Sequence, residues 1–110
     1  MNTLYLQVFL KFVTDILAGL RKIHDERNKI VHLDLKPENI MANIDDDDII
    51  TLKITDFGVS KPNGETIRSP VGTITTMAPE VFNAFGPQHL PVASPSMDVF
   101  SFGVVVWSGA

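Results

Sequence analysis

The stretches VHLDLKPEN, at residues 31–39, and ITDFG, at residues 54–58, decide the fold and the chemistry of this chain. They place Asp34, Lys36 and Asn39 within six residues, and put Asp56 directly after a run with the composition of a strand. Carboxylate and amide oxygens are ligands that Mg²⁺ accepts, and a lysine can lie beside a phosphate. These four residues are therefore the first candidates for chemistry, although each alone could equally be a turn former, a surface charge or a cap.

The residues between the two stretches predict a β-hairpin. Asn39–Ile44 and Ile49–Thr55 have the composition of short strands, and four aspartates, Asp45–Asp48, separate them. An EF-hand calcium loop needs a central glycine and a distal glutamate at fixed spacing, and neither follows these aspartates. We therefore expect a solvated turn.

Helices are expected on both sides of this hairpin. Apolar residues from Leu4 to about Arg27 recur at helical spacing, which predicts an amphipathic, core-facing helix. Residues 59–77 are rich in Ser, Thr, Pro and Gly and predict a long, mobile loop. A short helix from Ala78 to about Ala84 and a loop at residues 86–94 should follow. The apolar run Val99–Trp107 then predicts a helix buried on every side. The fold class is α+β, mainly helical with one short hairpin.

Composition excludes several classes of function. The chain has 110 residues, is 45% hydrophobic and 20% charged, and carries a net charge of −4 without a basic stripe, so nucleic acid is not an expected partner. It has no cysteine, which excludes disulfides and thiolate metal sites and permits a cytoplasmic location. Leu4–Val13 lacks the features of a signal peptide, and Val99–Trp107 is too short to span a bilayer, so no membrane partner is expected.

A third motif, MAPE at residues 77–80, completes an ordered set. In order and spacing the three motifs resemble the catalytic loop, the DFG motif and the APE motif of eukaryotic-type protein kinases. Asp98, in MDVFSFG at residues 97–103, resembles the aspartate that opens the central helix of the kinase C-terminal lobe. The resemblance covers about Val8 to Trp107. It implies that residues 1–110 are a partial kinase domain, from the catalytic loop to the central helix, without the N-terminal lobe or the final helices.

The resemblance also implies a role for each candidate. Asp34 would accept or orient the proton of the attacking hydroxyl, and Lys36 would place a cation near the transferred phosphate; lysine here is typical of serine/threonine kinases. Asn39 and Asp56 would bind Mg²⁺ and, with Lys36 and Met41, contact ATP. Met41 would lie beneath the adenine ring, although a core methionine would look the same. Thr73 would link the catalytic aspartate to the peptide-binding loop, unless it is an ordinary loop threonine. His32 and Phe57 would be scaffold residues that stack in a packed column anchored at Asp98.

Two departures from the family matter. Leu33 stands where the family usually has an arginine that grips a phosphate on the activation loop. The chain also contains no glycine-rich phosphate loop, strand lysine or partner glutamate, so an upstream or separate N-terminal lobe is an expected partner, and these 110 residues alone should be nearly inactive. The leading hypothesis is a serine/threonine kinase that uses ATP and Mg²⁺ on a protein substrate. The alternative is a non-catalytic, pseudokinase-like interaction module; a small-molecule phosphotransferase is disfavoured by MAPE.

Overall fold

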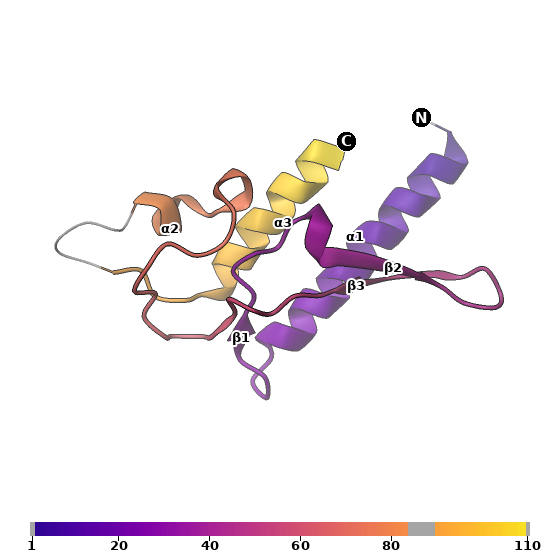
Figure 1. Cartoon of the computed structure of the whole chain (residues 1–110). Helices are drawn as coiled ribbons and strands as arrows, with labels where there is room; N and C mark the ends of the chain where they lie inside the picture. The colour runs from indigo at the N-terminus through magenta and orange to yellow at the C-terminus, as the bar shows by residue number, and fades with distance from the viewer. Residues whose placement is uncertain (1, 84–89, 110) are drawn as a thin grey trace.

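The computed structural model describes residues 2–83 and 90–109 (Figure 1). The two longest elements are helices, and the hairpin lies across the first of them. In chain order the elements are α1 (Thr3–His24), β1 (Ile30–Val31), the 3₁₀ turn η1 (Pro37–Asn39), β2 (Ile40–Ile44), β3 (Ile50–Ile54), β4 (Lys61–Pro62), the 3₁₀ turn η2 (Ile74–Thr76), α2 (Pro79–Asn83) and α3 (Pro95–Gly109). Helices with small antiparallel sheets confirm the α+β expectation.

Helix α1 is bounded by side-chain caps. The Asn2 side chain accepts a hydrogen bond from the Tyr5 amide at 2.7 Å, which satisfies a free donor of the first turn. At the other end, Asp25 Oδ1 accepts from the amides of Arg27 and Asn28 and turns the chain. The helix therefore stops three residues before the predicted Arg27. By length and composition α1 could cross a membrane, and both a core helix of a soluble protein and a signal sequence near the N-terminus meet the same criteria; 11% of its most apolar stretch is buried.

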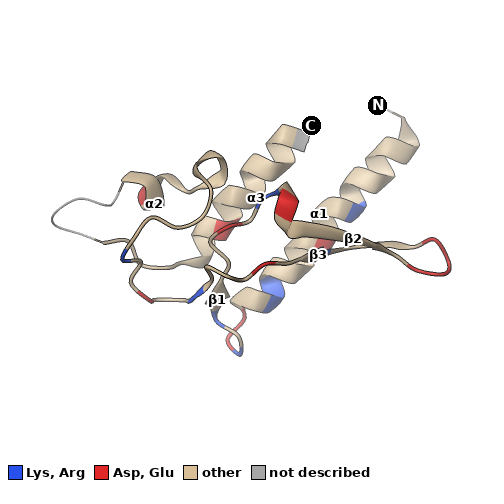
Figure 2. Cartoon of the chain, in the orientation of Figure 1, with Lys and Arg blue, Asp and Glu red and all other residues tan. Residues whose placement is uncertain are grey.

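Strands β2 and β3 pair antiparallel from Ile40 opposite Ile54 to Ile44 opposite Ile50. The predicted strands were at most one residue longer at an end. At the tip, Asp45 Oδ1 accepts from the amides of Asp47 and Ile49, both at 2.9 Å, so this carboxylate closes the turn. The hairpin projects from the rest of the chain with its acidic turn outermost (Figure 2). The predicted polar turn is confirmed.

Two apolar clusters hold the elements together. The first lies between α1, the hairpin and α3, where the rings of Phe12 and Phe102 stack with centroids 6.5 Å apart. The second lies beneath the segment between β4 and α2. The buried members are, in the first cluster, Ile16, Leu20, Leu35 and Phe102, and, in the second, Val31, Leu33, Ile67, Ala78, Val81, Ala93 and Met97.

The segment expected to be a long loop contains short regular elements. Strand β4 pairs with β1, and Thr66 forms an isolated bridge with Val92. The Ile67 amide donates to the Pro91 carbonyl at 2.8 Å. Part of the loop predicted at residues 86–94, and Ala84 of the predicted short helix, lie outside the described residues. The described part of α2 is where that helix was expected.

Helix α3 begins at Pro95, four residues before the predicted start, and is not buried on every side. Met97, Ser101 and Phe102 face the interior, whereas Val99 is 57% exposed and Trp107 is 81% exposed. The prediction that Val99–Trp107 would be buried on every side was therefore wrong. Among the described residues, η2, β1 and α1 cover only one side of the helix.

Candidate functional site

Asp34, Lys36 and Thr73 meet although Thr73 lies 39 residues beyond Asp34. The Thr73 hydroxyl donates to Asp34 Oδ1 at 2.8 Å, and Lys36 Nζ donates to Thr73 Oγ1 at 2.8 Å. Lys36 Nζ also lies 3.7 Å from Asp34 Oδ2. The Asp34 and Lys36 side chains are 17% and 26% exposed, so they reach solvent while remaining held. The result is a carboxylate with one oxygen fixed by a hydroxyl and a cation beside the other.

Asn39 is buried and oriented by Asp34. Its Nδ2 donates to the Asp34 carbonyl at 2.7 Å and approaches Asp34 Oδ2 at 3.4 Å. This fixes which way the amide points. Within the described residues, Asn39 Oδ1 accepts no hydrogen bond, so it is the atom of this side chain left for a ligand.

Asp56 lies two residues after the end of β3. The preceding residue, Thr55, donates to the Asn39 carbonyl through both its amide, at 2.8 Å, and its hydroxyl, at 3.1 Å. Asp56 has a φ of 58°, a left-handed conformation that aspartate tolerates better than most residues. Its Oδ1 accepts from the Gly58 amide at 3.2 Å, and the side chain is exposed. The residue before Asp56 is therefore hydrogen-bonded to the Asn39 backbone, which fixes where the chain leaves the hairpin.

Carboxylate and amide oxygens suit a hard cation in chemistry. Among the described residues, hydrogen bonds bring Asn39 and Asp34 together, whereas none joins the Asp56 side chain to either of them. Among the described residues, no three His, Cys, Asp or Glu side chains gather into a metal cluster of their own. Met41 lies on the neighbouring strand β2 and is 60% exposed. Its place on the surface suits contact with a ligand better than membership of a core.

A buried carboxylate holds the catalytic stretch in shape. Asp98, which is fully buried, accepts from the His32 amide at 2.8 Å and the Leu33 amide at 2.9 Å. His24 Nε2 lies 2.7 Å from the same carboxylate. Leu33 has a φ of 70°, which is unfavourable for a side chain of this kind, and the two amide bonds to Asp98 hold it there. The sequence pattern did not indicate His24, because a histidine in the last turn of a helix is common.

His32 joins the two decisive stretches. Its Nδ1 accepts from the Asp34 amide at 3.1 Å, and an amide can only donate. The ring proton therefore lies on Nε2, which donates to the Thr55 carbonyl at 2.8 Å. The Phe57 ring meets the His32 ring edge-on, with centroids 4.9 Å apart. His32 and Phe57 thus touch as expected, in an edge contact rather than a face-to-face stack.

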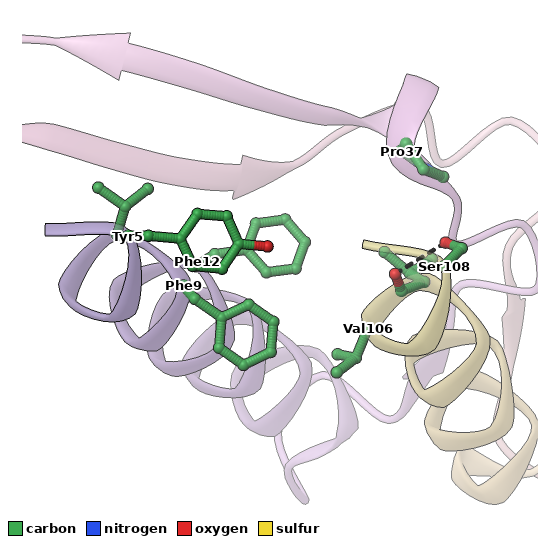
Figure 3. A pocket seen from close by; sticks show the side chains of 8 residues that line it. Tyr5, Phe9, Phe12, Pro37, Val106 and Ser108 are labelled. Carbon is green, nitrogen blue, oxygen red and sulfur yellow. Dashed lines mark hydrogen bonds between the residues drawn. The ribbon is translucent and has the colours of Figure 1, made fainter. Parts of the chain in front are cut away.

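Three cavities lie away from Asp34 and the side chains bonded to it. One of about 500 Å³ lies between α1 and β3, with Phe57 at its rim, and one of about 400 Å³ lies between α1 and α3 (Figure 3). A third, of about 440 Å³, lies between α1 and the hairpin tip. Asp34, Lys36, Asn39 and Thr73 line none of these three.

Comparison with known proteins gives a consistent result. The model of the protein kinase domain matches residues 3–109. A mitogen-activated protein kinase kinase kinase, dlk-1, of Caenorhabditis briggsae is 37% identical over 109 residues, which cover 96% of this chain and 11% of that protein. A probable serine/threonine-protein kinase of Dictyostelium discoideum is 33% identical over 96% of this chain and 10% of its own length. A seven transmembrane domain-containing tyrosine-protein kinase of the same organism is 40% identical over 84% of this chain and 12% of its own length. The chain therefore spans about a tenth of the length of these relatives.

Proposed function

The chain belongs to the protein kinase family, and we propose that it supplies the catalytic part of a serine/threonine kinase that transfers the γ-phosphate of ATP to a protein hydroxyl. The observation that carries this proposal is the contact between Asp34, Thr73 and Lys36. Phosphoryl transfer depends mainly on alignment and charge neutralisation, and these three residues provide an aligned base with a cation beside it.

Asp34 is the proposed proton acceptor. Thr73 ties down its Oδ1, so Oδ2 is the oxygen that can take the proton of an incoming hydroxyl. Lys36 Nζ lies close to both partners and can balance negative charge on the transferred phosphate. Thr73 also connects this base to η2, which begins at the next residue. A protein hydroxyl bound along that segment would be delivered to Asp34.

Asn39 and Asp56 are the proposed ligands of Mg²⁺, and Met41 is the proposed contact for the adenine ring. When bound, Mg²⁺ would neutralise the phosphate charge that opposes transfer. The support from this chain is the free Oδ1 of Asn39, fixed by its bond to Asp34, and the exposed carboxylate of Asp56. An N-terminal lobe on an upstream segment or a second chain would complete ATP binding. We also propose a cytoplasmic location, which the absence of cysteine permits.

The preference for serine or threonine rests on Lys36 and Thr73 together. Lys36 reaches the Thr73 hydroxyl at 2.8 Å, so each residue helps to place the other. Relatives named as serine/threonine kinases support this choice, while one relative is named a tyrosine kinase. An acceptor-peptide assay with serine, threonine and tyrosine in one sequence context distinguishes the two classes.

The test is phosphate transfer from ATP to a generic protein substrate, by the 110-residue chain and by the longer polypeptide that its gene encodes. Asp34→Asn should lower the rate by about 100-fold or more, the usual range for loss of a general base. Thr73→Val should lower it less, because the base stays but loses its orientation, and Thr75→Val is the matched control on an exposed neighbour. Full activity in Asp34→Asn would rule out the proposed role. The chain alone should transfer phosphate far more slowly than the roughly 1 per second of ordinary kinases.

A second candidate function has one observation in its favour. Leu4, Val8, Leu10 and Trp107 are all more than half exposed, which is unusual for large apolar side chains. A non-catalytic module that binds another protein through this surface would explain them. Unchanged MgATP binding in Asp56→Ala, measured by calorimetry, would favour this alternative over the kinase.

A further inference from the structure

Leu33 immediately precedes the proposed catalytic base, and its side chain is 8% exposed. It belongs to the buried cluster that includes Ile67, with Val71 and Met77 packed against that cluster. Ile67, Val71 and Met77 all lie in residues 59–77, the segment that leads from Asp56-Phe57-Gly58 to α2. The position at which the family resemblance predicts a charged arginine is therefore an apolar anchor beneath this segment.

The backbone of Leu33 is fixed as well. Its amide is bound by the buried carboxylate of Asp98. Its carbonyl oxygen lies so close to Gly72 that a side chain at Gly72 could not be accommodated. Gly72 has a φ of 88°, and the next residue, Thr73, donates to Asp34. Leu33 thus contacts segment 59–77 through its carbonyl, while its side chain sits in the cluster that this segment covers.

Backbone hydrogen bonds attach the segment as well. The Asn63 amide donates to the Lys29 carbonyl at 2.6 Å, and the Gly64 amide donates to the Ala93 carbonyl at 2.8 Å. Among the described residues, ion pairs join Lys11 to Asp15 and Lys36 to Asp34, and His24 contacts the Asp98 carboxylate. None of them involves a residue of the segment. Its attachments are apolar burial, backbone bonds and the hydrogen bonds of uncharged side chains, among them those of Thr73 to Asp34 and Lys36.

We propose that Leu33 is a positioning residue that docks segment 59–77 by apolar contact and so holds Thr73 on Asp34 without any phosphate on the segment. An arginine would hold a segment only when a phosphate is present, because it acts by charge pairing. Burial of apolar surface needs no such modification. The consequence for phosphate transfer rests on the proposed function, whereas the docking itself does not.

The docking predicts a local pattern of hydrogen exchange in the 110-residue chain. Leu33→Ala should speed exchange of the Ile67, Thr76 and Met77 amides by about tenfold or more, because local opening follows loss of buried contacts. The Leu52 and Thr55 amides of the hairpin, which bond to Asp15 and Asn39, are the internal reference and should change little. Leu33→Met should retain the parental rates because it stays apolar and of similar size.

Two further variants make the test specific. Leu33→Val removes one methylene and should speed the same three amides by a smaller factor, so the test survives if the alanine variant fails to fold. Ile44→Ala, at a residue that is 62% exposed on the hairpin, is the control for loss of an apolar side chain outside the cluster. Ser69→Glu and Thr75→Glu, which imitate phosphate at exposed positions, should leave the exchange of Ile67, Thr76 and Met77 unchanged.

The outcomes separate cleanly. The docking role is overturned if Leu33→Ala and Leu33→Val leave the three amides unchanged, or if the hairpin amides accelerate equally, which would mean general destabilisation. It is also overturned if an acidic substitution slows exchange of the segment by tenfold, since charge would then matter. If the pattern holds but the longer polypeptide transfers no phosphate, the proposed function fails and the docking stands.

Discussion

The two long helices are built differently along their lengths. Near the catalytic stretch, α1 ends at His24 and α3 begins close to Asp98, and these two side chains meet at 2.7 Å inside the molecule. We call this region the inner halves of the helices. Toward the two termini, which lie on the same side of the molecule (Figure 1), the outer halves carry Leu4, Val8 and Trp107 in solvent. Tyr5 and Phe9 of α1 and Val106 of α3 line an open apolar cavity there, with Pro37 above it (Figure 3).

In the inner halves the described residues bury and pair the polar groups, whereas in the outer halves they leave large apolar side chains exposed. In the inner halves, Asp98 has three hydrogen-bond partners, and no buried side-chain polar atom among the described residues lacks one. The proposed catalytic residues depend on this region. In the outer halves, large apolar side chains have little covering them. Substitutions in the inner halves should therefore cost much more stability than equivalent changes in the outer halves.

The largest effect is expected at Asp98. Asp98→Ala leaves the His32 and Leu33 amides buried without an acceptor and removes the partner of His24. Loss of one member of a buried, hydrogen-bonded pair costs roughly 3–5 kcal/mol. Urea unfolding should show a loss of this size. His24→Ala removes only one of the three contacts and should cost less; equal losses would mean that the two amide bonds contribute nothing.

A smaller effect is expected at Gly72, which packs against the Leu33 carbonyl. Gly72→Ala should destabilise the chain by roughly 1–3 kcal/mol, because the residue has a φ of 88° and its new methyl group would collide with that oxygen. Gly64→Ala is the matched control, since Gly64 has a φ of 92° but open space around it. The difference between the two free energies of unfolding isolates the collision. Equal losses of stability in the two variants would mean that the backbone near Leu33 moves away from the new methyl group at little cost.

The sequence allowed good prediction where the signal is local. The β2–β3 hairpin followed from two short runs and the aspartates between them, and Asp45 closes its turn by bonds to its own neighbours. The ordered motifs placed Asp34 and Asn39, which are five residues apart and touch. That Asp34 meets Thr73 was expected only through the family resemblance.

Long-range features could not be predicted in this way. His24 and Asp98 are 74 residues apart, and a histidine near a helix end gives no sign of a buried partner. The sequence singled out Leu33 only because it replaces an arginine. Its place in a buried cluster depends on Ile67, which is 34 positions away. The exposure of Trp107 was missed because a helix that is apolar all round has no pattern to mark its exposed face.

A modest pH effect is expected where α1 meets the hairpin. The Leu52 amide, which donates to Asp15 at 2.9 Å, and then Lys11 lower the pKa of Asp15, while burial opposes them. A lowered folded pKa means that the charged form adds stability above the unfolded pKa of about 4, and that this is lost as the pH falls through the folded value. Asp15→Asn should therefore be less stable than the parent at pH 6, by roughly 0.5–1 kcal/mol.

The measurement is urea unfolding of both proteins between pH 6 and pH 2.5. The gap should narrow as the pH falls, because the parent loses the charge that the variant never had. Asp46→Asn, in the exposed hairpin turn, is the control for loss of one negative charge. A gap that stays constant with pH would show that the Asp15 charge does not contribute.

The smallest effect on stability is expected in the outer half of α3, and it gives the sharpest contrast with the inner half. Trp107 is 81% exposed, whereas Phe102, five residues earlier, is 7% exposed and stacks on Phe12. Trp107→Ser should change the free energy of unfolding by no more than about 0.5 kcal/mol, as surface changes usually do. Phe102→Ala should cost roughly 3–5 kcal/mol, because it empties space in a packed cluster. Trp107→Ser should also reduce concentration-dependent self-association, measured by analytical ultracentrifugation, since exposed apolar patches promote it. A loss of 2 kcal/mol or more from Trp107→Ser would mean that the outer half is packed in solution and that the two halves do not differ as described.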